Sequence, residues 1–324
     1  MFGFFWLSGG AFLGWSLGAN TASTVFGTGV STHAVKFRTA VICICIFVIL
    51  GSFLQGVGGI RTLQNLSAGG NIESAFTIVF ATAITVAAMT VLKLPVSASQ
   101  GVVGAIIGMS LALGHNPEWY KLPKILLCWF GTPVGAIILS AGFYWALGGL
   151  WDRLNDRYSI EVLDAILSVG LIVVGSYGAY ALGANNIANV VGVFAGFKPF
   201  NEIDVRWLAA IGALSVCLGV ITYGKRVMYT VGENLVPLAP FTAFISVLSQ
   251  AATVHIFAMV GVPVSIAQAI VGSVLGIGLV KGMQSVNTRT MLNILVAWIS
   301  TPIVAGLMSF AIYRYVFVLI FHAK

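Results

Sequence analysis

The segment Gly18-Ala19-Asn20-Thr21-Ala22-Ser23-Thr24 interrupts a long apolar stretch, and a variant returns as Gly183-Ala184-Asn185-Asn186-Ile187-Ala188-Asn189, 165 residues later (183 − 18). We call these two segments the signatures. A second pair, Pro95-Val96-Ser97-Ala98-Ser99-Gln100 and Pro263-Val264-Ser265-Ile266-Ala267-Gln268, is spaced by 168 residues (263 − 95) and forms what we call the PVS segments. Repeats in the same order at nearly constant spacing indicate an internal duplication. The chain is therefore expected to fold as two copies of one unit.

The composition indicates that lipid is the main solvent of this fold. Apolar residues make up 59% of the 324 residues, charged residues only 8%, and the mean hydropathy is +1.00. A span needs about 20 apolar residues, and the chain offers ten such elements, of which the first and sixth are interrupted. They cover residues 2–35, 38–58, 72–92, 96–114, 124–148, 162–197, 206–223, 239–260, 263–280 and 290–320. We predict an all-α, multi-pass integral membrane protein.

The duplication and the polar middle of the chain predict its organisation. We expect a first transmembrane repeat over residues 1–150, a polar linker over 151–161 and a second transmembrane repeat over 162–324. About five elements in each half would insert the second repeat upside down, with discontinuous helices meeting at a site near the midplane. Lys and Arg in the gaps place both termini outside a prokaryotic-type plasma (inner) membrane. The PVS elements could be full spans or re-entrant hairpins.

Several classes of function fit the sequence poorly. The basic residues lie in short gaps between apolar runs, so the net charge of +7 does not indicate a nucleic-acid partner. Acidic residues lie almost entirely in loops and the four histidines are scattered, so we expect no enzyme active site and no metal centre. A lone buried histidine such as His255 is more often a packing residue than a proton relay.

Both repeated motifs have chemistry that suits a small anion. Backbone that leaves a helix at membrane depth must be buried or line a cavity, so a break at either signature would present amides and carbonyls to a ligand. Each PVS segment is typical of a helix N-terminus, with free N–H groups, partial positive charge and nearby hydroxyls. A single copy of either motif would be explained by helix packing or ordinary capping. Two copies favour a shared cage of donors.

The paired motifs resemble those of the inorganic phosphate transporter (PiT) family, which carries GANDVAN-type signatures and PVSTTH-type segments in both halves. The stretch from Gly224 to Gly232 is also similar to a conserved segment of that family. The resemblance implies a secondary transporter that couples anion uptake to Na⁺ or H⁺, needs no other cofactor and could form a homodimer. It implies a substrate site from both motifs, for which we expect Asn20, Thr21, Ser97, Ser99, Asn185, Asn186 and Ser265. As coupling-ion or supporting residues we expect Thr24, Gln100, Asn189 and Gln268.

The departures from the family pattern bear on which anion binds. Thr21 and Asn186 stand where the family has an acidic residue, so neither signature contains a carboxylate. Sulfate is fully ionised and only accepts hydrogen bonds, whereas phosphate carries a proton that a carboxylate could accept. On this chemistry we predict sulfate as the substrate, with phosphate as the alternative for the same transporter. A passive anion channel is a more distant alternative.

Overall fold

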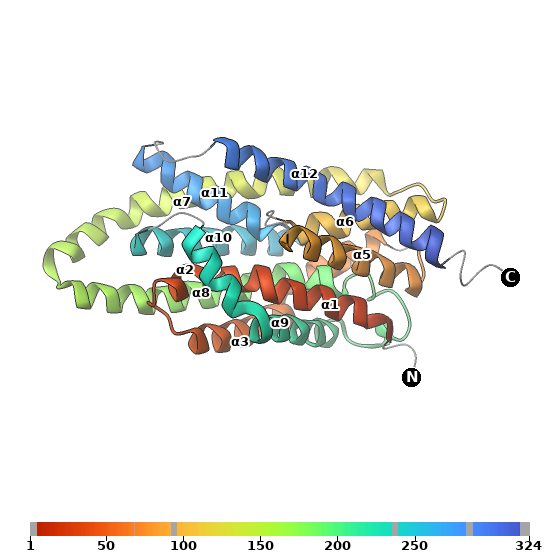
Figure 1. Cartoon of the computed structure of the whole chain (residues 1–324), viewed down its shortest axis with the longest axis horizontal. Coiled ribbons are helices and arrows are strands. Elements are labelled where there is room, and N and C mark those ends of the chain that lie inside the picture. The colour runs from red at the N-terminus through yellow and green to blue at the C-terminus, as the bar shows by residue number, and fades with distance from the viewer. Residues whose placement is uncertain (1–4, 68, 92–95, 235–238, 283–287, 318–324) are drawn as a thin grey trace.

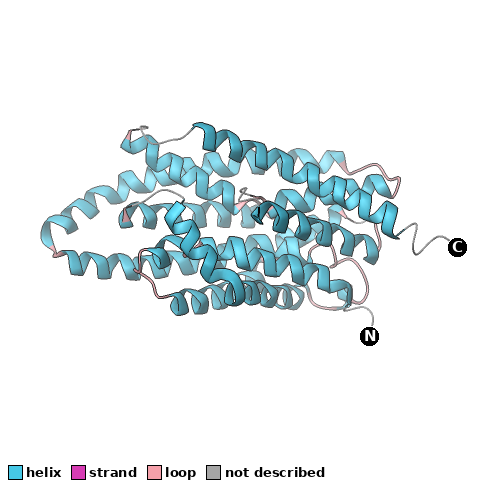
Figure 2. Ribbon diagram, viewed as in Figure 1, coloured by secondary structure: helices cyan, strands magenta, loops and turns pink. Residues whose placement is uncertain are grey.

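The computed structural model describes residues 5–67, 69–91, 96–234, 239–282 and 288–317, and this part of the chain is helical with no strand (Figures 1 and 2). Seven of its helices are long and apolar enough to cross a membrane. The helices of the first half are α1 (Leu7–Leu17), η2 (Gly18–Ala22), α2 (Gly27–Ser31), α3 (Phe37–Gln55), α4 (Val57–Leu66), α5 (Ile72–Val91), α6 (Ala98–Ala112), η3 (Trp119–Lys121) and α7 (Leu122–Arg157). Those of the second half are α8 (Ile160–Val191), η4 (Phe200–Glu202), α9 (Val205–Asn234), α10 (Pro240–Val260), α11 (Ile266–Lys281), α12 (Thr288–Ala311) and η5 (Ile312–Phe317).

Side chains on the outer helix faces confirm an integral membrane protein. Exposed apolar residues follow α3 at every fourth position, from Ile42 through Ile46 and Leu50 to Leu54. This spacing keeps them on one side of the helix. Such a stripe would be costly in water, but it is the normal surface of a helix that faces lipid.

The polar stretch expected as a linker is mostly helical. Helix α7 continues through Trp151 to Arg157, and the chain turns only at Tyr158 and Ser159 before α8 begins. Nothing in the polar composition prevents this, because Leu, Arg and Trp are compatible with a helix once its first turns are anchored in the bundle.

The two PVS segments begin helices that are too short to span. Helix α6 has 15 residues and α11 has 16, so each is about 23 Å long against about 30 Å of hydrocarbon. Each pairs with the preceding long helix, α6 with α5 and α11 with α10. In Figure 1 these two hairpins lie toward opposite ends of the longest axis. The ten expected elements are therefore not all full crossings, and the re-entrant alternative fits α6 and α11 better.

The helices of the two halves are packed against each other in a repeated pattern. Helix α3 packs most extensively on α8 of the other half, and its counterpart α9 packs on α1, η2 and α2. In the same way α6 packs on α12 and α11 packs on α7. Neither half forms a separate bundle, because the main partner of each of these helices comes from the other half.

Glycines at equivalent positions make these contacts close. A Cβ on Gly18 would overlap the carbonyl oxygen of Val216, and a Cβ on Gly183 would overlap that of Val48. The two carbonyls stand 168 residues apart (216 − 48), as do the PVS segments. The facing helices contain a second pair of equivalent glycines. A Cβ on Gly219 would overlap the carbonyl oxygen of Trp15, and a Cβ on Gly51 would overlap that of Tyr180. Small residues allow this approach of membrane helices, and the duplication is thus visible in the packing.

The two signatures do not adopt the same backbone, although interruptions were expected in both. The first forms the π-helical turn η2, and after Ser23 and Thr24 a turn at Val25 and Phe26 separates it from α2. The expectation for the second signature is wrong, because α8 runs without a break from Ile160 to Val191. The side chains supply a reason: Ser23 Oγ donates to the Gly18 carbonyl at 2.9 Å and Thr24 Oγ1 to that of Thr21 at 2.7 Å. Hydroxyls that bond to nearby carbonyls compete with the helix ladder.

Candidate functional site

The described residues of the PVS segments, 96–100 and 263–268, form helix N-termini as the sequence predicted, and Pro95 lies outside the described residues. The Ser97 hydroxyl accepts a hydrogen bond from the backbone N–H of Gln100 at 3.3 Å, and the Ser265 hydroxyl accepts one from that of Gln268 at 3.3 Å. Both serines are buried N-caps in extended backbone conformation. Each satisfies one of the free donors of its helix and leaves the partial positive charge of that end pointing into the protein.

The two helix starts meet inside the bundle. Ser99 Oγ lies 3.0 Å from the carbonyl oxygen of Val264, so the first turn of α6 touches the residue just before the cap of α11. Ser99 is 1% exposed. The dipoles of two short helices therefore converge on a buried region.

Asparagines of the second signature complete this meeting point. Ser99 Oγ also lies 3.2 Å from Asn186 Oδ1, and Asn189 Nδ2 donates to Ser99 Oγ at 3.0 Å and to Asn186 Oδ1 at 3.1 Å. We call Ser99, Asn186 and Asn189 the central cluster. It joins two residues expected in the substrate site with one that was expected only to support it.

Asn185 holds the tip of the α10–α11 hairpin in place. Its Oδ1 accepts from the backbone N–H of Val264 at 2.9 Å, and its Nδ2 donates to the carbonyl of Val262 at 3.3 Å. Both ends of the amide are therefore bonded to backbone groups of the non-helical segment between α10 and α11. Asn185 was expected to bind substrate directly, and the contacts found for it fix the hairpin tip beside the central cluster.

Several buried polar atoms around the central cluster have no hydrogen-bond partner among the described residues. They are one donor, Asn186 Nδ2, and three acceptors, Asn189 Oδ1, Gln100 Oε1 and Gln268 Oε1. An unsatisfied buried polar group costs about 1–3 kcal/mol. Four such atoms, on the first turns of α6 and α11 and on α8, make this region a candidate ligand site.

The first signature lies apart from this network. Asn20 Nδ2 donates to Thr90 Oγ1 of α5 at 2.8 Å, while Thr21 and Thr24 are half-buried. No hydrogen bond joins these residues to the central cluster in the described part of the chain. The position equivalent to Ser99 is Ala267 (267 − 99 = 168), which has no hydroxyl to offer.

Sequence reasoning did not identify the partners of His255. Its Nδ1 lies 2.9 Å from the Tyr177 hydroxyl and its Nε2 lies 2.6 Å from Gln55 Oε1. Both ring nitrogens are thus satisfied, in agreement with the expectation of a packing role. No pattern in the sequence relates Gln55 to a residue 200 positions away.

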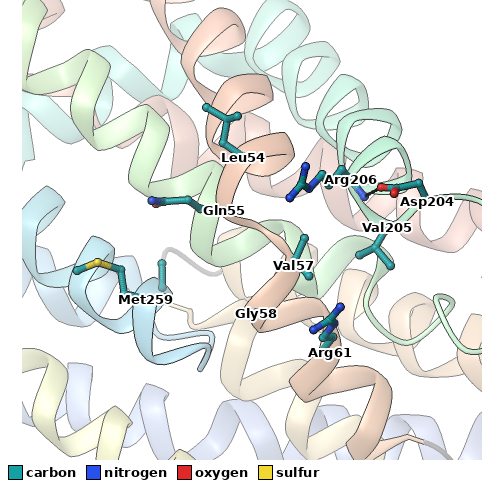
Figure 3. A pocket seen from close by; sticks show the side chains of 10 residues that line it. Leu54, Gln55, Val57, Gly58, Arg61, Asp204, Val205, Arg206 and Met259 are labelled. Carbon is teal, nitrogen blue, oxygen red and sulfur yellow. Dashed lines mark hydrogen bonds between the residues drawn. The ribbon is translucent and has the colours of Figure 1, made fainter.

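An open cavity of about 770 Å³ lies beside the bend between α3 and α4, the start of α9 and the end of α10 (Figure 3). Its wall includes Gln55, Arg61, Asp204, Arg206 and Met259. From the sequence alone, Arg61 and Arg206 were two of the basic residues in the gaps between apolar runs, which indicate only topology.

These features define a class of protein. The fold is a multi-pass helical bundle whose halves pack against each other, and buried polar groups lie where two helices too short to span meet. This arrangement is typical of secondary transporters.

Comparison with known proteins gives the particular family. Residues 17–309 match the phosphate transporter family, and the chain belongs to that family. A protein of Methanocaldococcus jannaschii named as a phosphate permease is 31% identical over 301 residues, covering 92% of each chain. One of Pyrococcus abyssi with the same kind of name is 24% identical over 386 residues, covering 94% of this chain and 95% of the relative. The family consists of transporters, so the protein is not an enzyme.

A solved structure has the same fold. "The sodium-dependent phosphate transporter" superposes with a TM-score of 0.84 and 20% sequence identity, covering 99% of this chain and 100% of the other. The resemblance predicted from the paired motifs is therefore confirmed over nearly the whole length.

Proposed function

We propose that the protein carries inorganic phosphate across the membrane and binds it at the central cluster. The single observation that carries the proposal is the set of buried, unpartnered polar atoms where α6 and α11 begin. The N–H groups of the two helix ends and Asn186 Nδ2 would donate to the phosphate oxygens. The site would thus hold an anion with dipoles and amides alone.

The choice of phosphate over sulfate rests on the unpartnered acceptors. The sequence favoured sulfate because neither signature has a carboxylate, but the relatives named above carry phosphate in their names. A carboxylate is not needed to read the proton of phosphate, since an amide oxygen such as Asn189 Oδ1 can accept it. Sulfate has no proton to donate and would leave that oxygen unsatisfied.

Na⁺ is the coupling ion that we propose. Hard cations take oxygen ligands, and the amide oxygens of Gln100 and Gln268 have no hydrogen-bond partner in the described structure. The protein of the same fold is described as sodium-dependent. Coupling without a signature carboxylate would then depend on amide and carbonyl oxygens.

Uptake into proteoliposomes tests substrate and coupling together. Labelled phosphate should accumulate against its gradient when Na⁺ is outside, and should not accumulate with K⁺ outside. Labelled sulfate should accumulate at least about fivefold less, because one lost hydrogen bond to a buried polar group costs about 1–3 kcal/mol. Sulfate uptake equal to that of phosphate would overturn the substrate, a proton gradient that replaces Na⁺ would overturn the coupling ion, and downhill flux alone would indicate a channel.

A further inference from the structure

The cavity beside the α3–α4 bend is separate from the central cluster and is rich in positive charge. Arg61 projects from α4 and Arg206 from the first turn of α9, and both are exposed. Figure 3 shows the two guanidinium groups on either side of the same space. Neither forms an ion pair or a hydrogen bond through its guanidinium within the described part of the chain. Two free guanidinium groups at one cavity are thus available to a ligand.

The one carboxylate on the cavity wall has a structural task. Asp204 Oδ1 accepts the backbone N–H of Arg206 at 2.8 Å, which caps the start of α9. A further cation lies near the rim, since Lys124 Nζ donates to the carbonyl of Val260, the neighbour of Met259 in the wall. Positive groups therefore outnumber negative ones around the opening, and an anion is the favoured occupant.

The floor of the cavity contacts the hairpin tip that borders the central cluster. A Cβ on Gly58, which lines the cavity, would lie 3.2 Å from the Cα of Gly261. Gly261 ends α10 in the left-handed conformation (φ 77°), and its carbonyl accepts from Thr62 Oγ1 at 2.6 Å. The next residues, Val262 and Val264, are those that Asn185 holds. An ion bound in the cavity would be separated from the tip of the α10–α11 hairpin by a single layer of backbone.

We propose that this cavity is a second binding site for a phosphate group, held between the guanidinium groups of Arg61 and Arg206. A guanidinium presents paired N–H donors that match the oxygens of phosphate, and two of them can neutralise a dianion. The site is open to water, so its affinity is modest and sensitive to salt. The phosphate group belongs either to the inorganic ion or to a lipid headgroup. The proposal stands without the transport assignment, because neither arginine belongs to the central cluster.

Binding measurements on purified protein test the site. Protein in a maltoside detergent without phospholipid would be titrated with inorganic phosphate by calorimetry, and lipid retention would be followed by native mass spectrometry during titration with phosphatidylglycerol. The variants are Arg61→Gln, Arg206→Gln and their double. Arg153→Gln, at an exposed position on the last turns of α7, serves as a matched control.

We expect the double variant to bind one of the two ligands with about tenfold lower affinity at about 0.02 M salt. At about 0.3 M salt the loss of affinity should be less than about threefold. Arg61→Lys should restore only part of the affinity, because the paired donors are lost. The control should bind both ligands like the wild type. Loss of inorganic phosphate identifies the free ion, and loss of phosphatidylglycerol identifies the headgroup. Unchanged binding of both ligands in a folded double variant would overturn the proposal.

Discussion

The two signatures occupy equivalent places in the bundle yet differ in backbone and in chemistry. Gly18 and Gly183 each press against a carbonyl of the facing helix, at Val216 and Val48. From that shared point, the first signature opens into a π-helical turn with half-buried threonines. The second continues as a regular helix with three buried asparagines. The close packing is therefore shared by both halves, whereas the polar side chains differ between them.

The largest effects should come from the shared packing. Gly183→Val or Gly18→Val would place side-chain atoms on a backbone carbonyl that cannot move aside, and overpacking of this kind costs about 1–3 kcal/mol or more. We expect both variants to lose most of the folded peak in fluorescence size-exclusion chromatography. Gly142→Ala is the control, since a Cβ there meets nothing within 4 Å. If one of the two signature variants folded normally and the other did not, the two glycine contacts would not be equivalent.

A smaller effect separates Asn185 from Asn20. Asn185→Leu removes two hydrogen bonds to the backbone of the α10–α11 tip, and leaves buried backbone groups unpaired at a cost of about 2–4 kcal/mol. Asn20→Leu removes the single bond to Thr90 that the structure shows, at about 1 kcal/mol. Thermal unfolding in detergent measures both. Equal losses would mean that the first signature holds its hairpin as firmly as the second.

The smallest of these effects distinguishes Ser99 from Ala267. Ser99→Ala deletes a hydroxyl that contacts Asn186, Asn189 and Val264, and we expect phosphate uptake to fall about five- to tenfold, equivalent to about 1–1.4 kcal/mol. Ala267→Ser adds the missing hydroxyl of the other half, where nothing is arranged to receive it. Uptake should then stay within about twofold of the wild type. A larger effect of Ala267→Ser would show that the two half-sites contribute alike.

Much of the fold could be predicted because it depends on local sequence. Apolar length predicted the seven helices long enough to span, although ten spanning elements were expected. The Pro-Val-Ser triplets predicted the starts of α6 and α11. The paired spacing predicted that the halves would correspond, and packing bears this out. Three expectations stay predictions. They are the inversion of the second repeat, the homodimer, and the boundaries at residues 1–150, 151–161 and 162–324.

The site was harder to predict, because its roles depend on contacts between distant segments. Asn20 and Asn185 each end a Gly-Ala-Asn triplet, so the sequence suggested the same role for both. Only the fold shows that Asn185 forms hydrogen bonds to the backbone of Val262 and Val264. The shared glycines predicted a break in both signatures, but α8 is unbroken, and the hydroxyls of Ser23 and Thr24 in the first signature have no counterpart in the second. Arg61 and Arg206 are 145 residues apart (206 − 61) and share a cavity only through folding.

Phosphate binding to a matched pair of signature variants tests the central claim most directly. Asn186→Leu removes the free donor of the central cluster, and Thr21→Val alters the equivalent position of the first signature (186 − 165 = 21) with little change of shape. Both substitutions would be made in the Arg61→Gln/Arg206→Gln double variant, which lacks the proposed second site. Calorimetric titration would then measure phosphate binding at the central cluster only. We predict that Asn186→Leu weakens phosphate binding at least about tenfold, while Thr21→Val stays within about threefold of its parent. Equal losses, or a greater loss from Thr21→Val in folded protein, would contradict the assignment of the substrate to the second signature.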